Sequence, residues 1–200
     1  MGLEDRPRHH RWSGMAKRPQ AQAELDVVPV PLTVMDNHDP AVMSELVDAV
    51  RDVAASGAFT GGPFIERFEQ AFADWNESPH SVGVSSGTEA LTLTLRALDV
   101  NTGDEVLLPA NSFIATAEAV VLAGATPRFA DVDPDTQLIT AATVERLQGP
   151  RVCGIIPVHL FGRTVEMDAI IGLARKWGAW VVEDCAQAHG SRYDGRRVGT

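Results

Sequence analysis

The chain has 200 residues, of which 44% are hydrophobic and 22% charged, as is typical of a globular protein with a core. Its net charge of −10 argues against a general nucleic-acid-binding role, because such proteins need basic surfaces to contact phosphates. There is no apolar run of the roughly 18 residues that span a bilayer, and Cys153 and Cys185 lie in apolar contexts typical of free thiols in a reducing compartment, so we expect a cytoplasmic protein without a membrane partner.

The first elements in chain order are a tail and two helices. Residues 1–26 are rich in Arg, His, Pro and Gln without periodicity, which predicts a disordered tail before an ordered domain at 27–200. Asp39-Pro40 predicts the start of a helix that Gly57 ends. A second helix follows the turn at 61–63, and we interpret its stripe of Phe64, Phe68, Phe72 and Trp75 as core packing.

From residue 81 onward the pattern alternates between strands and helices. The strand segments are short and apolar on both faces, as in a buried parallel sheet. Strands are predicted at 81–85, 105–109, 126–131, 152–158 and 180–184, and helices at 87–98, 115–123, 141–148 and 165–177. This order predicts an α/β fold with a doubly wound, mostly parallel sheet.

The first strand end whose residues could form a binding site is Ser85-Ser86-Gly87-Thr88, which joins a predicted strand to a helix. Small residues let the backbone approach an anion, and a helix N-terminus offers unpaired N–H groups and a positive dipole. The segment therefore suits a phosphate cradle, although an ordinary N-cap by a serine or threonine explains it equally well.

Two further strand ends carry suggestive side chains. Phe113 follows the strand at 105–109 and could stack on a planar ring or simply pack in the core. Asp184 ends the apolar strand at 180–184, where an unpaired carboxylate would be costly, so it needs a partner such as a protonated pyridine nitrogen. Gln187 could then donate to a phenolate oxygen on the same ring, while the plainer interpretation is that Asp184 caps a turn.

Other kinds of site fit the residues less well. The segment 83–87 matches the Gly-x-Ser-x-Gly pattern of a serine hydrolase with Ser85 as nucleophile, but Asp184 and His189 lie too close in sequence for a triad. A metal site formed by Asp184, Cys185 and His189 is too compact for known zinc spacings, so we expect no metal.

Taken together, segments from about Val30 to the last residue resemble the DegT/StrS family of sugar aminotransferases, which are fold-type I enzymes that use pyridoxal 5′-phosphate (PLP). The segments that carry the resemblance are Ser56-Gly57 through Gly61-Gly62-Pro63, Ser85-Ser86-Gly87-Thr88-Glu89-Ala90-Leu91, Gly103-Asp104-Glu105-Val106, Pro109 through Ala115-Thr116-Ala117, Pro157-Val158-His159-Leu160-Phe161-Gly162 and Glu183-Asp184-Cys185-Ala186-Gln187-Ala188-His189-Gly190. The resemblance implies that residues 27–200 are a partial PLP-binding large domain.

The resemblance also implies roles for individual residues. Ser86, Gly87 and Thr88 would bind the cofactor phosphate, and Phe113 would stack on the pyridine ring. The catalytic pair would be Asp184 at the ring nitrogen and Gln187 at the ring hydroxyl. The family's substrates are nucleotide-linked keto-sugars with an amino acid, usually glutamate, as nitrogen donor, and its members are homodimers.

Two further residues are expected at the substrate by the same resemblance. Gly61 resembles a loop residue that meets the sugar nucleotide. His159 follows a strand end where it would line the pocket, and the alternative is that it is a structural histidine.

The family's Schiff-base lysine has no counterpart in this chain. Lys17 lies in the predicted tail and Lys176 near the end of a helix, and neither follows a strand. In the family the lysine follows a Gly-rich hairpin that the segment 193–197 resembles, so we expect a truncated chain that is inactive alone. Two alternatives stay open, namely a dehydratase of the same family that uses pyridoxamine phosphate (PMP), and a non-catalytic remnant that only binds or dimerises.

Overall fold

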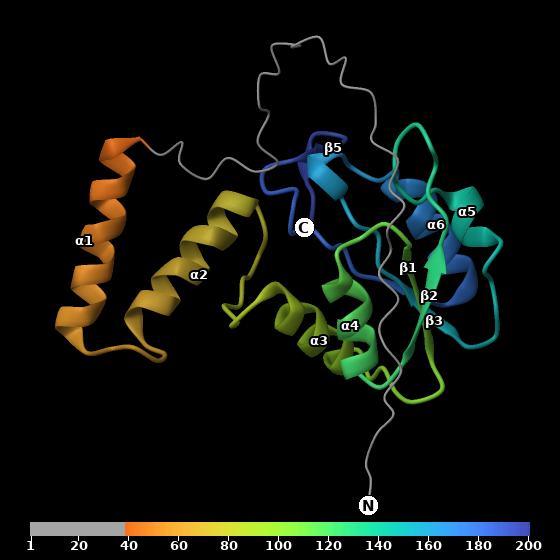
Figure 1. Ribbon diagram of the computed structural model, residues 1–200, viewed down its shortest axis with the longest axis horizontal. Coiled ribbons are helices and arrows are strands. Elements are labelled where there is room, and N and C mark those ends of the chain that lie inside the picture. The colour runs from red at the N-terminus through yellow and green to blue at the C-terminus, as the bar shows by residue number, and fades with distance from the viewer. Residues whose placement is uncertain (1–38) are drawn as a thin grey trace, which may run out of the picture. The chain divides into compact units, whose positions relative to one another are not determined.

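The computed structural model describes residues 39–200, which are coloured in Figure 1. The predicted tail at 1–26 and the predicted onset of order at residue 27 lie outside the described residues. The chain divides after Asp52 into two compact units, and we describe each by itself.

The first helix, α1, runs from Pro40 to Ser56 and crosses the boundary between the units. Its predicted start is confirmed, since Asp39 Oδ1 accepts a hydrogen bond from the N–H of Ala41 at 2.8 Å. Gly57 follows the helix with φ 70°, a left-handed conformation that favours glycine at a helix end.

Helix α2, Pro63–Asn76, begins as predicted with Pro63 in its first turn. The interpretation of its aromatic stripe as core is wrong, because Phe68 is 59% and Trp75 44% exposed. The helix does not lie on the sheet, and Trp75 instead packs under the Arg197 guanidinium, 4.2 Å from the ring centre. Periodicity showed which face of α2 is apolar but not what would cover it.

A four-stranded sheet with the order β2-β1-β3-β4 forms the centre of the second unit, and all its neighbouring pairs are parallel. The strands are β1 Glu105–Pro109, β2 Thr126–Ala130, β3 Val152–Ile155 and β4 Trp180–Val181. The helices around the sheet are α3 Gly87–Ala97, α4 Ile114–Leu122, α5 Ala141–Glu145 and α6 Met167–Trp177. A 3₁₀ turn (η1) at Leu160–Gly162 follows β3, and a hairpin of β5 Arg192–Tyr193 with β6 Arg196–Arg197 follows β4.

Helices cover both faces of this sheet, which confirms the predicted doubly wound α/β fold. Successive residues of β1 point to opposite faces. Val106 and Leu108 join the buried cluster that includes Leu95 of α3 and residues of α4, whereas Leu107 joins the cluster of α5 and α6 around Ile170. Figure 1 shows α3 and α4 on one side of the strands and α5 and α6 on the other.

Most predicted elements are confirmed within a few residues, but the strand predicted at 81–85 is wrong. That segment has no regular structure, and Val82 is 78% exposed. A strand needs a neighbour for its main-chain groups, and no strand of the described part of the chain pairs with it. Among the described residues, its backbone has one hydrogen-bond partner, the Glu69 carboxylate, which accepts from the N–H of Gly83 at 2.7 Å.

At the amino ends of the strands, a carboxylate ties three strands together. Glu105 of β1 pairs with Arg128 of β2 at 2.8 Å and with Arg151, which precedes β3. Burial raises the pKa of Glu105, but the hydrogen bonds from the two arginines outweigh it, and the pKa lies below its ordinary value. This cluster is at the end of the sheet away from the predicted site, so its role is structural.

Gly154 of β3 packs directly against Trp180 of β4, and a Cβ at residue 154 would lie 2.3 Å from the indole ring. We expect Gly154→Ala to lower the free energy of unfolding by about 1–3 kcal/mol, because a well-packed site must shift to accept an extra methyl group. Chemical denaturation would measure this, with Gly172→Ala as control, since a Cβ at Gly172 of α6 meets nothing within 4 Å. Equal stabilities of the two variants would contradict the expectation.

Candidate active site

A cavity of about 240 Å³ opens at the carboxyl ends of the strands. It is lined by Gly87 and Thr88 from the start of α3, Phe113 after β1, Val158 after β3, and Asp184 after β4. In this strand order, β2 lies on one side of β1, whereas β3 and β4 lie on the other. The strand order therefore reverses between β1 and β3, and in open α/β sheets ligands bind at such a switch point. The three segments singled out in the sequence therefore meet at one cavity, although the one at Gly87 follows no strand.

The Asp184 carboxylate is held at both oxygens. The Thr116 hydroxyl donates to Oδ2 at 2.8 Å, and the N–H of Ala186 donates to Oδ1 at 3.1 Å. Thr116 lies in the first turn of α4, is 1% exposed, and shares a second hydrogen bond at 2.9 Å with the Ser112 hydroxyl. Sequence reasoning missed Thr116 as a partner of Asp184. Its position three residues after Phe113, on the same strand-to-helix connection, was the available signal.

The structure confirms an N-cap at the start of α3, and the phosphate cradle stays a prediction. Ser86 is the N-cap, and its Oγ accepts a hydrogen bond from the N–H of Glu89 at 3.1 Å. Gly87 and Thr88 line the cavity. A Cβ at Gly87 would meet no atom within 4 Å, and Gly87 does not have a positive φ. Neither crowding nor backbone conformation requires a glycine there, so the space it leaves is open to a ligand.

Phe113 and Gln187 both line the cavity. Phe113 is 72% exposed, so it is not the core residue that the plainer interpretation required. Gln187 Oε1 accepts a hydrogen bond from the N–H of Phe161 at 3.0 Å, which leaves its NH₂ group as the donor end.

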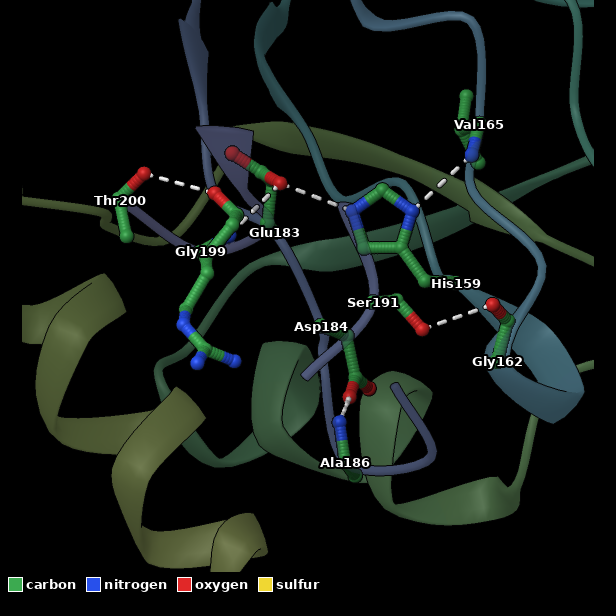
Figure 2. A network of polar contacts seen from close by, with 10 residues as sticks. His159, Gly162, Val165, Glu183, Asp184, Ala186, Ser191, Gly199 and Thr200 are labelled. Carbon is green, nitrogen blue, oxygen red and sulfur yellow. Dashed lines mark hydrogen bonds and ion pairs between the residues drawn. The ribbon is translucent and has the colours of Figure 1, made fainter. Parts of the chain in front are cut away.

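The structure corrects the expectation that His159 lines the pocket. The ring is fully buried and hydrogen-bonded to Glu183 and to the main chain at Val165, as Figure 2 shows. Gly61 lies apart from Asp184, at a second cavity of about 620 Å³ that Phe64 and Phe68 of α2 also line. The predicted substrate role of Gly61 stays a prediction.

Next to Asp184, the fold brings together His159, Glu183 and Cys185, whose possible ligand atoms lie within 4.8 Å of one another. This is not the set Asp184, Cys185 and His189 that the sequence suggested. Burial, with the nearby charges of Glu183 and Asp184, raises the pKa of the Cys185 thiol to about 12. Metals bind the thiolate, and both ring nitrogens of His159 already have hydrogen-bond partners, so the cluster is a poor metal site.

The serine hydrolase alternative lacks its geometry. A nucleophile elbow places the serine between a strand and a helix, whereas 81–85 forms no strand. Ser85 is exposed and lines the second cavity rather than that of Asp184.

Comparisons with known proteins show the family of this chain. Residues 40–200 match the family described as the DegT/DnrJ/EryC1/StrS aminotransferase family. This chain belongs to that family. It is 41% identical over 171 residues to a UDP-N-acetyl-3-dehydro-α-D-glucosamine 3-aminotransferase of Acidithiobacillus ferrooxidans, a match that covers 86% of this chain and 46% of the relative. It is 44% identical over 151 residues to a dTDP-3-amino-3,4,6-trideoxy-α-D-glucose transaminase of Streptomyces venezuelae, covering 76% and 40%.

Solved structures of aminotransferases share the fold. DesV of S. venezuelae, in complex with a ketimine intermediate, superimposes with a TM-score of 0.78 at 42% identity, covering 80% of this chain and 43% of that one. NtdA of Bacillus subtilis with bound PMP superimposes with a TM-score of 0.77 at 34% identity, covering 84% and 39%. This DegT/DnrJ/EryC1/StrS chain thus spans less than half the length of these relatives. Within residues 39–200, no helix is long and apolar enough to cross a membrane.

Proposed function

We propose that this chain forms the cofactor-binding part of a PLP-dependent transaminase that moves an amino group from a glutamate-like amino acid to a nucleotide-linked keto-sugar. The observation that carries the proposal is the Asp184 carboxylate, held by two hydrogen bonds at a cavity beside the N-terminus of α3. The names of the two curated relatives, a UDP-sugar aminotransferase and a dTDP-sugar transaminase, support the substrate class. Residues 27–200 would then be part of the large domain, and the active protein a homodimer.

The residues around the cavity fit PLP group by group. The start of α3 at Gly87 and Thr88 would hold the phosphate, because helix N-termini bind anions and the missing side chain of Gly87 leaves room. Phe113 would lie against the ring, and Asp184 would pair with the ring nitrogen. Gln187 would donate from its NH₂ group to the ring oxygen, since its own oxygen already accepts from Phe161.

When bound, PLP supplies an electron sink for the carbanion that forms when an amino acid loses its α-proton. The residues of this chain would keep the ring protonated, and a protonated ring accepts electrons more readily. A carboxylate beside the ring nitrogen favours the protonated ring, and Thr116 and Ala186 hold the Asp184 carboxylate in one orientation. Because Thr116 is buried, this orientation does not depend on solvent.

The lysines of this chain allow a direct test of how PLP is held. Lys176 is the one lysine among residues 39–200, and it is exposed in the last turn of α6. We expect PLP to bind reversibly, with quenching of tryptophan fluorescence and competition by inorganic phosphate, and without a covalent link. Borohydride treatment of the complex should leave the intact mass of the chain unchanged.

The control for this experiment is Lys176→Arg, which removes any adduct at the one lysine among residues 39–200. A borohydride-stable PLP adduct at one defined residue of the wild-type chain would contradict the expected reversible binding. A failure of PLP to bind at all would contradict the proposed function itself.

A further inference from the structure

Two acidic residues, Glu183 and Asp184, follow each other directly where the chain leaves β4, yet only one of them lines the cofactor cavity. Successive residues of an extended segment point to opposite faces. Asp184 lines the cavity with Gly87 and Gln187, and Glu183 does not. Figure 2 shows the two carboxylates extending in different directions from adjacent positions. A shift of this segment by one residue would bring Glu183 to the place of Asp184 at the cavity, and Val182 would then take the place of Glu183.

The main-chain ladder that sets this register is short. β4 pairs with β3 at two positions, Gly154 with Trp180 and Ile155 with Val181. Beyond them, a single bridge joins Val158 to Asp184. The Asp184 N–H donates to Pro157 at 2.9 Å, and the His159 N–H donates to the Asp184 carbonyl at 3.1 Å. A few hydrogen bonds therefore decide which carboxylate faces the cavity.

The His159 side chain adds a contact that only Glu183 receives. The ring is fully buried, and its Nδ1 accepts the N–H of Val165 at 3.0 Å. The ring proton consequently lies on Nε2, which donates to Glu183 Oε2 at 2.8 Å. The same oxygen accepts the N–H of Gly199 at 3.0 Å. Burial raises the pKa of Glu183, but the hydrogen bonds from His159 and Gly199 outweigh it and hold the pKa below its ordinary value.

We propose that His159 is a positioning residue that fixes the register of the segment after β4, so that Asp184 and not Glu183 faces the cofactor cavity. In a shifted register, the Nε2–H of a fully buried ring would lose its carboxylate acceptor, and Gly199 would lose its partner. An unpaired buried donor carries its whole desolvation cost. The inference rests on the proposed function for its cofactor, but the register itself is a property of the chain alone.

Two isosteric substitutions separate the contacts of His159. His159→Gln places an NH₂ group where Nε2 donates to Glu183, and His159→Asn places an oxygen where Nδ1 accepts from Val165. We expect His159→Gln to keep slow hydrogen exchange at the Asp184 and Gly199 amides and to bind PLP within about threefold of wild type. We expect His159→Asn to exchange faster at both amides and to bind PLP about tenfold more weakly.

A double-mutant cycle tests register directly. In the wild-type background, Asp184→Asn should weaken PLP binding much more than Glu183→Gln, whose amide oxygen can still accept from His159. In the His159→Asn background, the cost of Asp184→Asn should fall, and Glu183→Gln should now weaken binding. Equal losses of PLP affinity in His159→Gln and His159→Asn would overturn the proposal. An unchanged cost of Asp184→Asn in the His159→Asn background would do so as well.

Glu105→Gln provides the matched control for loss of a carboxylate that ties strands together. It breaks ion pairs at the other end of the sheet, so it should lower the midpoint of thermal unfolding without changing PLP binding or exchange at Asp184. If wild type bound no PLP, the proposed function would fail while the exchange experiment still decided the register. Unchanged protection of the Asp184 amide in His159→Asn would then overturn the role of His159.

Discussion

Replacing Asp184 with asparagine should weaken PLP binding by about 10- to 100-fold, because a hydrogen bond to a charged group contributes roughly 1.5–3 kcal/mol. Asparagine keeps the shape of the side chain, and its single carbonyl oxygen can still accept from one of the two groups, Thr116 or Ala186, that now hold the carboxylate. What it removes is the negative charge beside the ring nitrogen. Fluorescence titration with PLP would measure the change.

The same substitution should change the protonation of the bound ring. Without the carboxylate, the protonated form of the nitrogen loses its counter-ion, so the pKa of the ring nitrogen should fall. The ¹⁵N chemical shift of ring-labelled PLP, recorded at neutral pH, reports this directly. A merely structural role for Asp184 would lower affinity without moving that shift.

Asp168→Asn is the control for the loss of one negative charge. Asp168 is an exposed acid in the first turn of α6, where its charge contributes only about 0.3–1 kcal/mol to helix stability. PLP binding should match wild type in this variant. Equal losses of affinity in Asp184→Asn and Asp168→Asn would show that overall charge, rather than the ring contact, governs binding.

Gly87→Leu should abolish most PLP binding while leaving the fold intact. A Cβ at residue 87 would meet no protein atom within 4 Å, so the new side chain starts in open space. It does occupy the place proposed for the phosphate, and forcing a group into an occupied site costs about 1–3 kcal/mol or more, equivalent to roughly 10- to 100-fold in affinity. Stability should be unchanged or slightly higher, because leucine favours helices more than glycine does.

The size of the substituent and its position provide the controls. Gly87→Ala should give a smaller loss than Gly87→Leu, since its side chain extends less far. Ala97→Leu adds similar bulk at the opposite, exposed end of α3 and should not affect PLP binding. If Gly87→Leu bound PLP as tightly as wild type, the proposed position of the phosphate at the start of α3 would be wrong.

The sequence was informative wherever a signal is local. The starts of α1 and α2 at Pro40 and Pro63, and the start of α3 at Gly87, are confirmed because capping and proline effects depend on near neighbours. The positions of Asp184 and Phe113 at strand ends followed from the same alternation of strands and helices, and the parallel order of the strands made those ends meet.

The wrong predictions have one physical cause: each depended on contacts between segments that are far apart in the sequence. The segment 81–85 has strand-like residues, but a strand exists only with a neighbour to pair with. The aromatic face of α2 has the periodicity of a core helix, but exposure depends on what packs against it. His159 follows a strand end, as a pocket residue would, and yet its ring turns into the protein toward Glu183.

The sequence by itself determined the order of most elements, the α/β class, the family, and the residues of the three segments that meet at the cavity. Only the tertiary structure decided that Thr116 holds Asp184 across 68 residues of chain, and that His159 holds Glu183 across 24. The reason is that a side chain's direction in an extended segment reverses with each residue. A one-residue register, set by contacts between distant segments, therefore determines which of two adjacent carboxylates faces the cavity.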